Sequence, residues 1–455
     1  MNAMSTLAHK LAPQPPSLPL IGNLLGLQRK GQLQYQIDNW QQYGDIVRLQ
    51  LGPFTVHMLA HPDYIRHVLI ENRQNYGRGR GYQVLKLFTG EGLLTSEGDF
   101  WKRQRRLLQP PFTPKAVPLY VPEVTATLTK FLQRWDVYAA NGTVIDVQAE
   151  MLKLTLQILG RTMFHLDLEE EAADLLAAFT TAITLVGNKI TAGLDVPLAV
   201  PTPANLRLKR ALRTLDQRVY AFIAERQRRP TAYTDLLAQL LSARDPETGE
   251  SMNLHQVRDE VMTILFAGHE TIAQTLTWAW YLLAQHPAVE TQLFTELTVK
   301  LGGRTPEATE LMQLPYTGMV IHEVMRLYPA VWAIPRGANG DDEIAGYHIP
   351  AGSMVFPVPY NVHRHPAFWP EPEAFKPERW ASEEITQLPD CAYLPFGDGP
   401  RACIGRHYAL QEALLVIATI AQRYQLQLAP SQKVTPHSAI TLGPQHGIKL
   451  QLKRR

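Results

Sequence analysis

The sequence predicts a mainly α-helical protein with a small β region. Apolar residues recur at helical spacing through most of the chain beyond residue 64. One such pattern runs from Leu254 to His286 without a break until Pro287, about 45 Å at the rise of an α-helix, which is long enough to cross a whole domain. Two short β patterns, Ile46 to Leu51 and Thr55 to Ala60, flank a Gly-Pro pair and predict an early hairpin.

The composition is that of a folded globular protein. Hydrophobic residues make up 45% of the 455 residues and charged residues 19%, which allows a substantial core. The formal net charge of +2 gives no overall attraction for nucleic acid or an anionic membrane. The stretch from Met1 to Pro19 has no apolar run that could serve as a signal or membrane span. We expect a single domain over residues 1–455 with a loose tail at residues 1–15, in a soluble, monomeric, cytoplasmic protein without a transmembrane anchor.

Several segments between the hairpin and the long helix are predicted to be helical, because each has apolar residues spaced three and four positions apart. They are Tyr64 to Glu71, Val121 to Val137, Val147 to Phe164, Ala172 to Leu185, Leu208 to Arg229 and Tyr233 to Arg244. Prolines and small residues predict a loop from Gly187 to Pro203, and Asp245 to Ser251 has the composition of a surface turn. The glycine-rich segment Gly77 to Gly81 lacks the flanking strand and helix of a dinucleotide turn, so we expect a mobile loop there.

The middle of the long helix carries a polar run, Ala267 to Thr271. Glycine inside a helix costs about 1 kcal/mol relative to alanine, and polar groups in a buried helix need partners. Ala267 and Gly268 are small enough to admit a ligand, while the Glu270 carboxyl and the Thr271 hydroxyl could hold water and relay protons to bound dioxygen. The alternative is a helix crossing at Gly268 with ordinary polar bonds, and the five residues alone do not separate the two interpretations.

A thiol near the C-terminus lies in the loop Phe396 to Gly405, directly before a helical pattern that continues to Arg423. The N–H groups at a helix N-terminus stabilise a thiolate, so Cys403 is a candidate axial ligand of haem iron. For an isolated cysteine the alternative is a buried free thiol, and we expect Cys391 to be one. The two cysteines are too few for a zinc ribbon or a disulfide scaffold, which favours a reducing compartment.

The same loop offers residues suited to a flat macrocycle that carries carboxylates. Gly399 and Gly405 are expected to adopt positive φ and to let the backbone pass close to the ring. Arg401 supplies a fixed cation of the kind that pairs with a haem propionate. Trp101 and Arg105 lie four apart in a basic helical pattern and present two donors on one face, which also suits a carboxylate.

Other charged residues have structural interpretations. Glu323 and Arg326 can pair on one helix face, although an exposed pair contributes only about 0–1 kcal/mol. Arg379 could close a buried network with them, and the role of that network would be structural. The neighbours of Trp101 are expected to be solvated, or to form a patch for an acidic electron donor; they are Lys102, Arg103 and Arg106.

Four motifs, FGDGPRACIG, AGHET, EVMR and PERW, occur in the order and approximate spacing of the cytochrome P450 family of haem-thiolate monooxygenases. The segments WKRQR and IPR, the latter at Ile334 to Arg336, match as well, and the chain resembles this family from about Pro16 to Lys453. The resemblance implies a triangular helical fold that encloses haem b between the long helix and the helix after the cysteine loop.

The resemblance also implies roles for individual residues. Cys403 would be the axial ligand, with Phe396 over the sulfur, and Thr271 with Glu270 would serve oxygen activation. The implied propionate partners are Trp101, Arg105, Arg336 and Arg401, and the other residues implied at the cofactor are Ala267, Gly268 and Gly405. The implied structural network is Glu323, Arg326 and Arg379.

The implied reaction inserts one oxygen atom of dioxygen into a hydrophobic substrate, such as a fatty acid, terpenoid or carotenoid, by hydroxylation or epoxidation. Electrons would come ultimately from NAD(P)H through a separate ferredoxin or flavodoxin and its reductase, because the chain ends soon after Cys403. The candidate pocket residues follow the contact regions of the family: Tyr82, Leu85, Phe88, Phe266, Val331, Trp332, Ala333, Ile440 and Leu442. Core packing explains each of them individually, whereas the set suggests an apolar pocket.

Two other functions remain open at this point. A peroxide-dependent or rearranging haem-thiolate enzyme usually lacks the acid and the alcohol of the long helix, whereas Glu270 and Thr271 are present. A haem sensor or carrier needs neither an oxygen-activating helix nor an apolar cleft. The sequence therefore favours a monooxygenase.

Overall fold

The computed structural model describes residues 10–168, 172–191, 196–229 and 235–455. Backbone contacts divide the chain into two compact units. The β-rich unit comprises Met1–Gln83, Trp332–Glu373 and Gln387–Ala402, and the helical unit comprises Val84–Val331, Ala374–Thr386 and Cys403–Arg455. Helices predominate and the sheets are small, which confirms the predicted fold class. The expected single domain over residues 1–455 stays a prediction.

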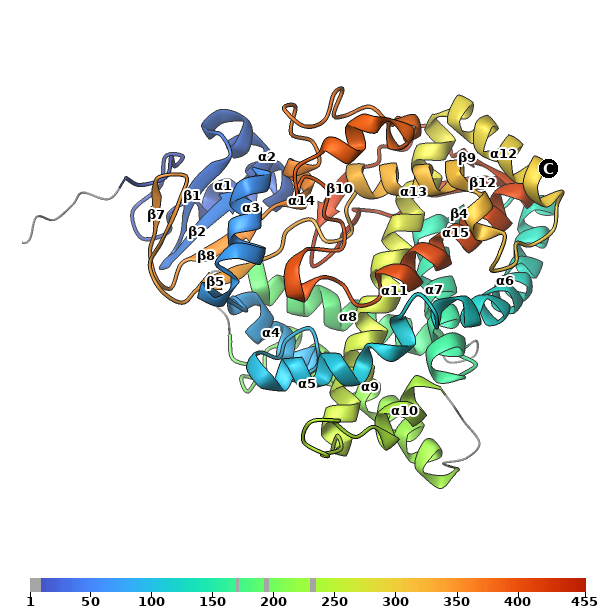
Figure 1. The fold of residues 1–455 in the computed structure, drawn as a ribbon, viewed down its shortest axis with the longest axis horizontal. Coiled ribbons are helices and arrows are strands. Elements are labelled where there is room, and N and C mark those ends of the chain that lie inside the picture. Colours follow the sequence, from blue (N-terminus) through green and yellow to red (C-terminus); the bar gives the residue numbers. More distant parts are fainter. Residues whose placement is uncertain (1–9, 169–171, 192–195, 230–234) are drawn as a thin grey trace, which may run out of the picture. The chain divides into compact units, whose positions relative to one another are not determined.

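The β-rich unit is built on a five-stranded sheet in the order β1-β2-β8-β5-β3. Figure 1 labels β1, β2, β8 and β5. Its strands are β1 (Ile46–Leu51), β2 (Phe54–Leu59), β3 (Tyr76–Gly77), β5 (Arg336–Ala338) and β8 (Met354–Pro357). β1 and β2 pair antiparallel with Ile46 opposite Leu59, which confirms the early hairpin. β2 and β8 run parallel. A separate hairpin joins β6 (Asp342–Ile344) to β7 (Tyr347–Ile349).

Short helices complete the β-rich unit. They are α1 (Leu24–Lys30), α2 (Gln32–Tyr43), α3 (Pro62–Arg66) with a π-helical turn at His67–Glu71, and α14 (Pro359–Val362). Side chains from the sheet and from α3 form one core, in which Leu59, Ile65 and Val355 have no solvent exposure. Burial of each such side chain contributes roughly 1.5–3 kcal/mol. The predicted helical segment Tyr64 to Glu71 is confirmed as α3 and the π-helical turn.

The other unit is larger and mainly helical. Along the chain, the boundary between the two units falls within α4 (Arg80–Thr89). The further helices of the larger unit are α5 (Gly98–Leu108), α6 (Val121–Asn141), α7 (Val147–Phe164), α8 (Ala172–Thr191), α9 (Pro203–Arg228), α10 (Leu236–Ser242), α11 (Leu254–Gln285), α12 (Pro287–Leu301), α13 (Pro315–Leu327) and α15 (Arg406–Arg423). Each predicted helix is present, with ends that differ by a few residues. The first two residues of the predicted segment Tyr233 to Arg244 lie outside the described residues.

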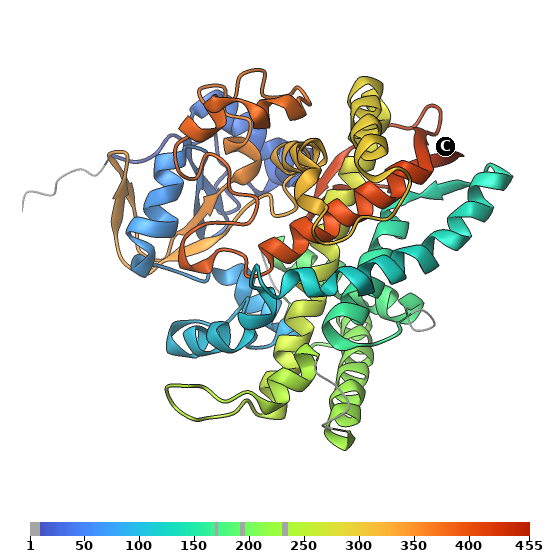
Figure 2. The same cartoon turned by 45° about the vertical axis from the view of Figure 1, so that its right-hand side comes forward.

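The long helix α11 has the predicted extent. It begins with a capping box, in which the Asn253 side chain accepts from the Gln256 backbone N–H and the Gln256 side chain accepts from the Asn253 backbone N–H. Pro287 follows its end and starts α12. Residues on all sides of α11 are buried, since the helix packs against α7 and α15, as the two views in Figures 1 and 2 show. A helix that is buried all round can wall a site in the interior of this unit.

Two predicted loops are wrong in part. The loop expected from Gly187 to Pro203 begins later, because α8 continues to Thr191 and packs Gly187 beside Ile440; residues 192–195 of that loop lie outside the described residues. In the segment Gly77 to Gly81, Gly77 ends β3, which pairs with β5, and Arg80 starts α4. Most of the segment that was expected to be a mobile loop therefore has regular secondary structure. The turn Asp245 to Ser251 is confirmed, closed by a bridge between Arg244 and Ser251.

Two small sheets belong to the helical unit. One contains β4 (Val144–Asp146), β12 (Lys449–Arg454) and β9 (Tyr424–Leu428) in that order. The other is a C-terminal hairpin of β10 (Pro436–Ser438) and β11 (Leu442–Pro444). Within the described part of the chain, no helix is both long and apolar enough to cross a membrane.

Candidate active site

Cys403 lies immediately before α15, and Gly405 caps the N-terminus of that helix. The thiol keeps solvent-exposed surface. Protein nevertheless surrounds it closely, so burial raises the pKa of Cys403, while the Gly405 N–H and the Arg105 and Arg406 guanidinium groups oppose the rise. Exposed surface on an otherwise enclosed sulfur suits an axial ligand, because iron must reach one side of it. The donor set around Cys403 therefore fits haem bound through a thiolate.

The two loop glycines differ. Gly399 has φ +68° as expected, and a Cβ there would lie 2.4 Å from the Leu69 carbonyl oxygen, so only glycine fits. Gly405 has φ −88°, so the prediction of positive φ at that position is wrong. Gly397, two positions before Gly399, is the other loop glycine with left-handed backbone, at φ +68°. Gly405 acts instead as the cap whose N–H reaches the Cys403 sulfur.

The α5 candidates lie as their spacing predicts. Arg105 is stacked over the Trp101 indole, 5.7 Å from the ring centroid. Burial lowers the pKa of Arg105, and the negative charge of the Cys403 thiolate opposes that change. The helical unit therefore places a cation near the thiol.

A pair of acids in the first half of α11 anchors the segment that leads into α5. Asp259 Oδ2 accepts the Glu91 N–H at 2.8 Å, and Glu260 Oε2 accepts the Leu93 N–H at 2.9 Å. The Gln104 carboxamide, on α5 itself, donates to Glu260 Oε1 at 2.9 Å. Burial raises the pKa of Glu260 to about 8, with the Asp259 charge adding to the rise. Sequence reasoning missed this anchor, because acid and amide partners lie more than 150 residues apart.

The β-rich unit gathers three arginines around one phenol. The Arg78 guanidinium stacks over the Tyr82 ring, 4.3 Å from its centroid. Burial alone would raise the pKa of Tyr82, but the charges of Arg78, Arg336 and Arg401 lower it. Two of these, Arg336 and Arg401, are predicted propionate partners, and Arg78 joins them. This concentration of positive charge fits the carboxylates of haem.

Phe396 is half-buried in the β-rich unit, whereas Cys403 belongs to the helical unit. The role of Phe396 over the sulfur stays a prediction. Cys391 is a buried free thiol whose Sγ donates to Asp398 Oδ2 at 3.5 Å. Burial and the Asp398 charge raise the pKa of Cys391, which makes it a poor thiolate ligand.

The acid and the alcohol of α11 are neighbours with different partners. The Thr271 hydroxyl donates to the Ala267 carbonyl at 2.8 Å, so its oxygen remains an acceptor. Glu270 Oε1 accepts from the Thr441 hydroxyl at 2.6 Å. Burial raises the pKa of Glu270 to about 7, and the Thr441 hydrogen bond opposes that rise. Sequence reasoning missed Thr441, which no local pattern links to Glu270.

Gly268 lies at a helix crossing. A Cβ on Gly268 would lie 3.0 Å from both Leu159 methyl groups, on α7. One turn away on α7, the Thr155 hydroxyl donates to the His269 carbonyl at 2.9 Å. These contacts support the helix-packing interpretation for Gly268, with Ala267 as the acceptor for Thr271.

Glu323, Arg326 and Arg379 form one buried network. Glu323 Oε1 accepts from Arg326 Nη2 at 2.8 Å and from Arg379 Nε at 2.9 Å, and Glu323 and Arg326 have no exposed side-chain surface. Glu323 Oε2 accepts from Arg326 Nε at 2.9 Å and from the Trp380 indole at 3.0 Å. Lys376 N–H also donates to Oε1, at 3.0 Å. Sequence reasoning missed the indole, although Trp380 lies within the PERW motif.

The predicted pocket residues are divided between the units. Tyr82, Trp332 and Ala333 belong to the β-rich unit and the others to the helical unit. The Phe88 ring packs edge-on against Phe266 with centroids 5.4 Å apart. Leu85, Phe88 and Leu442 are buried, as core packing predicts, whereas Val331 is 38% exposed. Within the helical unit, the structure brings Phe88 and Phe266 into contact.

The basic residues beside Trp101 are largely ion-paired. Arg103 contacts Glu250 at 3.0 Å, and Arg106 contacts Asp245 at 3.0 Å and Glu247 at 2.9 Å. The expectation of a solvated side chain is wrong for Arg103, which is 14% exposed because the acidic turn after α10 packs against α5, whereas the Arg106 side chain is paired but still 36% exposed. Lys102 is exposed and pairs with Asp99 on its own helix.

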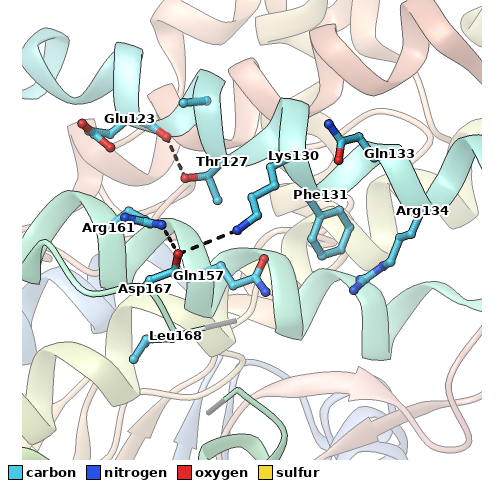
Figure 3. A pocket seen from close by; sticks show the side chains of 11 residues that line it. Glu123, Thr127, Lys130, Phe131, Gln133, Arg134, Gln157, Arg161, Asp167 and Leu168 are labelled. Atoms are coloured by element: carbon cyan, nitrogen blue, oxygen red, sulfur yellow. Dashed lines mark hydrogen bonds and ion pairs between the residues drawn. The ribbon is translucent and has the colours of Figure 1, made fainter. Parts of the chain in front are cut away.

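A cavity of about 420 Å³ lies between α6 and α7 in the helical unit (Figure 3). Its lining is mostly polar: Asp167 forms ion pairs with Arg161 and, at 3.7 Å, with Lys130. None of the predicted pocket residues lines it. A cavity whose charges are already paired does not suit an apolar substrate.

Comparison with known proteins identifies the class to which this architecture belongs. The family model described as Cytochrome P450 matches residues 13–451. Cyclooctatin synthase of Streptomyces melanosporofaciens is 34% identical over 94% of this chain and 93% of its own. Cyclooctat-9-en-7-ol 5-monooxygenase of the same organism is 34% identical over 91% and 89%. Pentalenene oxygenase of Streptomyces avermitilis is 32% identical over 97% of both chains.

The chain belongs to the cytochrome P450 family of haem-thiolate monooxygenases. It is an oxidoreductase with haem as its cofactor.

Proposed function

We propose that this enzyme hydroxylates or epoxidises a terpenoid. The observation that carries the chemistry is the Cys403 thiol before α15, which keeps exposed surface and has the Gly405 N–H and the charge of Arg105 beside it. The substrate class is supported by the relatives whose names refer to pentalenene and to cyclooctat-9-en-7-ol, both terpenoid substrates. The buried aromatic pair Phe88 and Phe266 supports an apolar substrate.

Haem bound through a thiolate supplies the reduction of dioxygen and the insertion of one oxygen atom into the substrate. In this proposal the Cys403 Sγ would hold the haem, and the Gly405 N–H and the Arg105 charge would favour the thiolate against the effect of burial. Trp101 and Arg105 are the propionate candidates within the helical unit, and Arg336 and Arg401 are those within the β-rich unit. Glu270 would store a proton at its carboxyl, and the Thr271 oxygen would accept a hydrogen bond from water.

Electrons come, in this proposal, from NAD(P)H through a separate ferredoxin or flavodoxin and its reductase, in the cytoplasm. Lys102 remains exposed on α5, whereas Arg103 and Arg106 are engaged with the acidic turn. An acidic donor that docks at α5 would therefore meet less positive charge than the sequence of this helix predicts.

The thiolate is tested by the reduced, carbon-monoxide-bound spectrum of the holoenzyme. The wild type should show the red-shifted Soret band of a thiolate-ligated haem, and Cys403→Ser should lose it. Cys391→Ser is the matched control and should keep the band, since that buried thiol is held by Asp398. A red-shifted band in Cys403→Ser would refute the assignment.

The substrate class is tested by titrating the ferric enzyme with terpenes, fatty acids and carotenoids. A terpene should displace haem-bound water and raise the high-spin fraction at the lowest concentration. The turnover of that terpene should be coupled to reductant consumption in the wild type and poorly coupled in Thr271→Ala. Preference for a fatty acid would contradict the terpenoid assignment without affecting the thiolate.

A further inference from the structure

Three α11 side chains, spaced four residues apart on one face of the helix, hold the C-terminal hairpin. Glu270 accepts from the Thr441 hydroxyl at 2.6 Å, and the Trp278 indole donates to the Leu442 carbonyl at 3.0 Å. Between them, Gly443 lies so close to Gln274 that a Cβ would be 2.7 Å from the Gln274 Oε1. The turn between β10 and β11 is therefore fixed to α11 at the position of the acid.

The two oxygens of the Glu270 carboxyl have different environments. Oε1 is engaged by Thr441, and both residues are buried, at 7% and 4% exposure. Oε2 is also buried and has no hydrogen-bond partner within the described part of the chain. Burial raises the pKa of Glu270 to about 7. Among the described residues, no charged group contributes to that shift, and Thr441 alone opposes it.

The residue before Thr441 faces a different helix. Ile440 lies beside Gly187 of α8, where a Cβ would be 3.5 Å from the Ile440 Cγ1. Ile440 is also one of the predicted pocket residues. Adjacent positions of one short turn thus contact α8 and α11.

We propose that Thr441 is a positioning residue for Glu270: its hydroxyl holds one carboxyl oxygen, leaves Oε2 to pass the proton, and links that arrangement to its neighbour Ile440, a predicted pocket residue. This inference rests on the proposed function, in which Glu270 delivers protons. It adds a residue outside the AGHET motif and a route by which substrate binding reaches the acid. The proton leaves Oε2 and is replaced from water, so the carboxyl is regenerated.

The test uses the holoenzyme with Thr441→Val, which keeps the shape and removes the donor, and Thr441→Ser, which keeps the donor. The infrared C=O band of the protonated Glu270 carboxyl is identified as the band lost in Glu270→Gln. In Thr441→Val the band should move to higher frequency, because its oxygen no longer accepts a hydrogen bond. The apparent pKa of Glu270 should rise by about one unit, the size expected for a lost bond to a charged group. Thr441→Ser should resemble the wild type in both measurements.

Catalysis supplies the second readout. Thr441→Val should lower kcat and the coupling of reductant to product with little change in KM, and Thr441→Ser should restore both. Farnesol, used as an apolar probe, should shift the Glu270 band in the wild type and leave it unshifted in Thr441→Val. The carbon-monoxide spectrum reports the fold of each variant, and Thr441→Ala provides the same test with a smaller side chain.

An unchanged band and an unchanged pKa in Thr441→Val or Thr441→Ala would overturn the positioning role. A wild-type band that farnesol leaves in place, while farnesol raises the high-spin fraction, would overturn the link between Ile440 and the acid. Failure of the proposed function would give a different result. Glu270→Gln would then keep full coupling of reductant consumption to product, while a shifted Glu270 band in Thr441→Val would still support the contact between Thr441 and Glu270.

Discussion

Replacing Glu323 with glutamine tests how the buried network of the helical unit is stabilised. The carboxylate accepts five hydrogen bonds, from Arg326, Arg379, Trp380 and the Lys376 N–H. Glutamine has the same shape, but one oxygen becomes an NH₂ group that points at donors. The substitution also leaves the fully buried Arg326 without its counter-charge.

The expected cost follows from these contacts. Removing one partner of a buried ion pair typically costs about 3–5 kcal/mol. Trp380→Phe removes only the indole donor at 3.0 Å, and a lost bond to a charged acceptor costs about 1.5–3 kcal/mol. Glu384→Gln changes an exposed acid nearby and should stay within about 0.5 kcal/mol of the wild type. Since whole proteins are stable by only about 5–15 kcal/mol, the first variant should be severely destabilised.

Urea unfolding of the holoenzyme, followed by tryptophan fluorescence and by the Soret band, measures these differences. The free energy of unfolding should fall in the order wild type and Glu384→Gln, then Trp380→Phe, then Glu323→Gln. Equal stability of Glu323→Gln and Glu384→Gln would refute the reasoning, because the buried carboxylate would then contribute nothing beyond its shape.

Two further predictions concern the cysteine loop and the anchor of α5. Gly399→Ala should lower the ratio of Soret to protein absorbance far more than Gly397→Ala does. Both glycines have φ +68°, but only at Gly399 would a Cβ meet backbone, 2.4 Å from the Leu69 carbonyl oxygen. Equal loss of Soret absorbance in the two variants would contradict this prediction. Glu260 has a pKa of about 8 when folded, against an ordinary value of 4.5, so the folded state binds more protons between these values and stability falls as pH rises through the interval. Glu260→Gln should lessen the fall in unfolding free energy with pH by up to about 1.4 kcal/mol per pH unit, as measured by unfolding between pH 5 and 8. An identical dependence of unfolding free energy on pH in the wild type and in Glu260→Gln would count against a raised pKa of Glu260.

Local sequence was sufficient for the elements and for the cysteine loop. The helical spacing of apolar residues located α7, α11 and α15 to within a residue or two, because a helix that packs along its length must repeat its apolar face. It was insufficient at glycines. Gly187 suggests a loop but lies inside α8, where a Cβ would make only an ordinary contact with Ile440. Gly405 has ordinary backbone angles and serves as a helix cap.

The sequence by itself determined the class of the protein. Each of its motifs is a contiguous stretch and can therefore be recognised from the sequence alone; they are AGHET, EVMR, PERW and the cysteine loop. The tertiary structure decided which partners these motifs have. Glu270 is held by Thr441, 171 positions away, and Glu323 by Trp380, 57 positions away. Arg103 and Arg106 are neutralised by a turn more than 130 residues further along the chain. The physical reason is that hydrogen bonds and ion pairs depend on distance in space, and chain folding brings such residues together without leaving a local pattern.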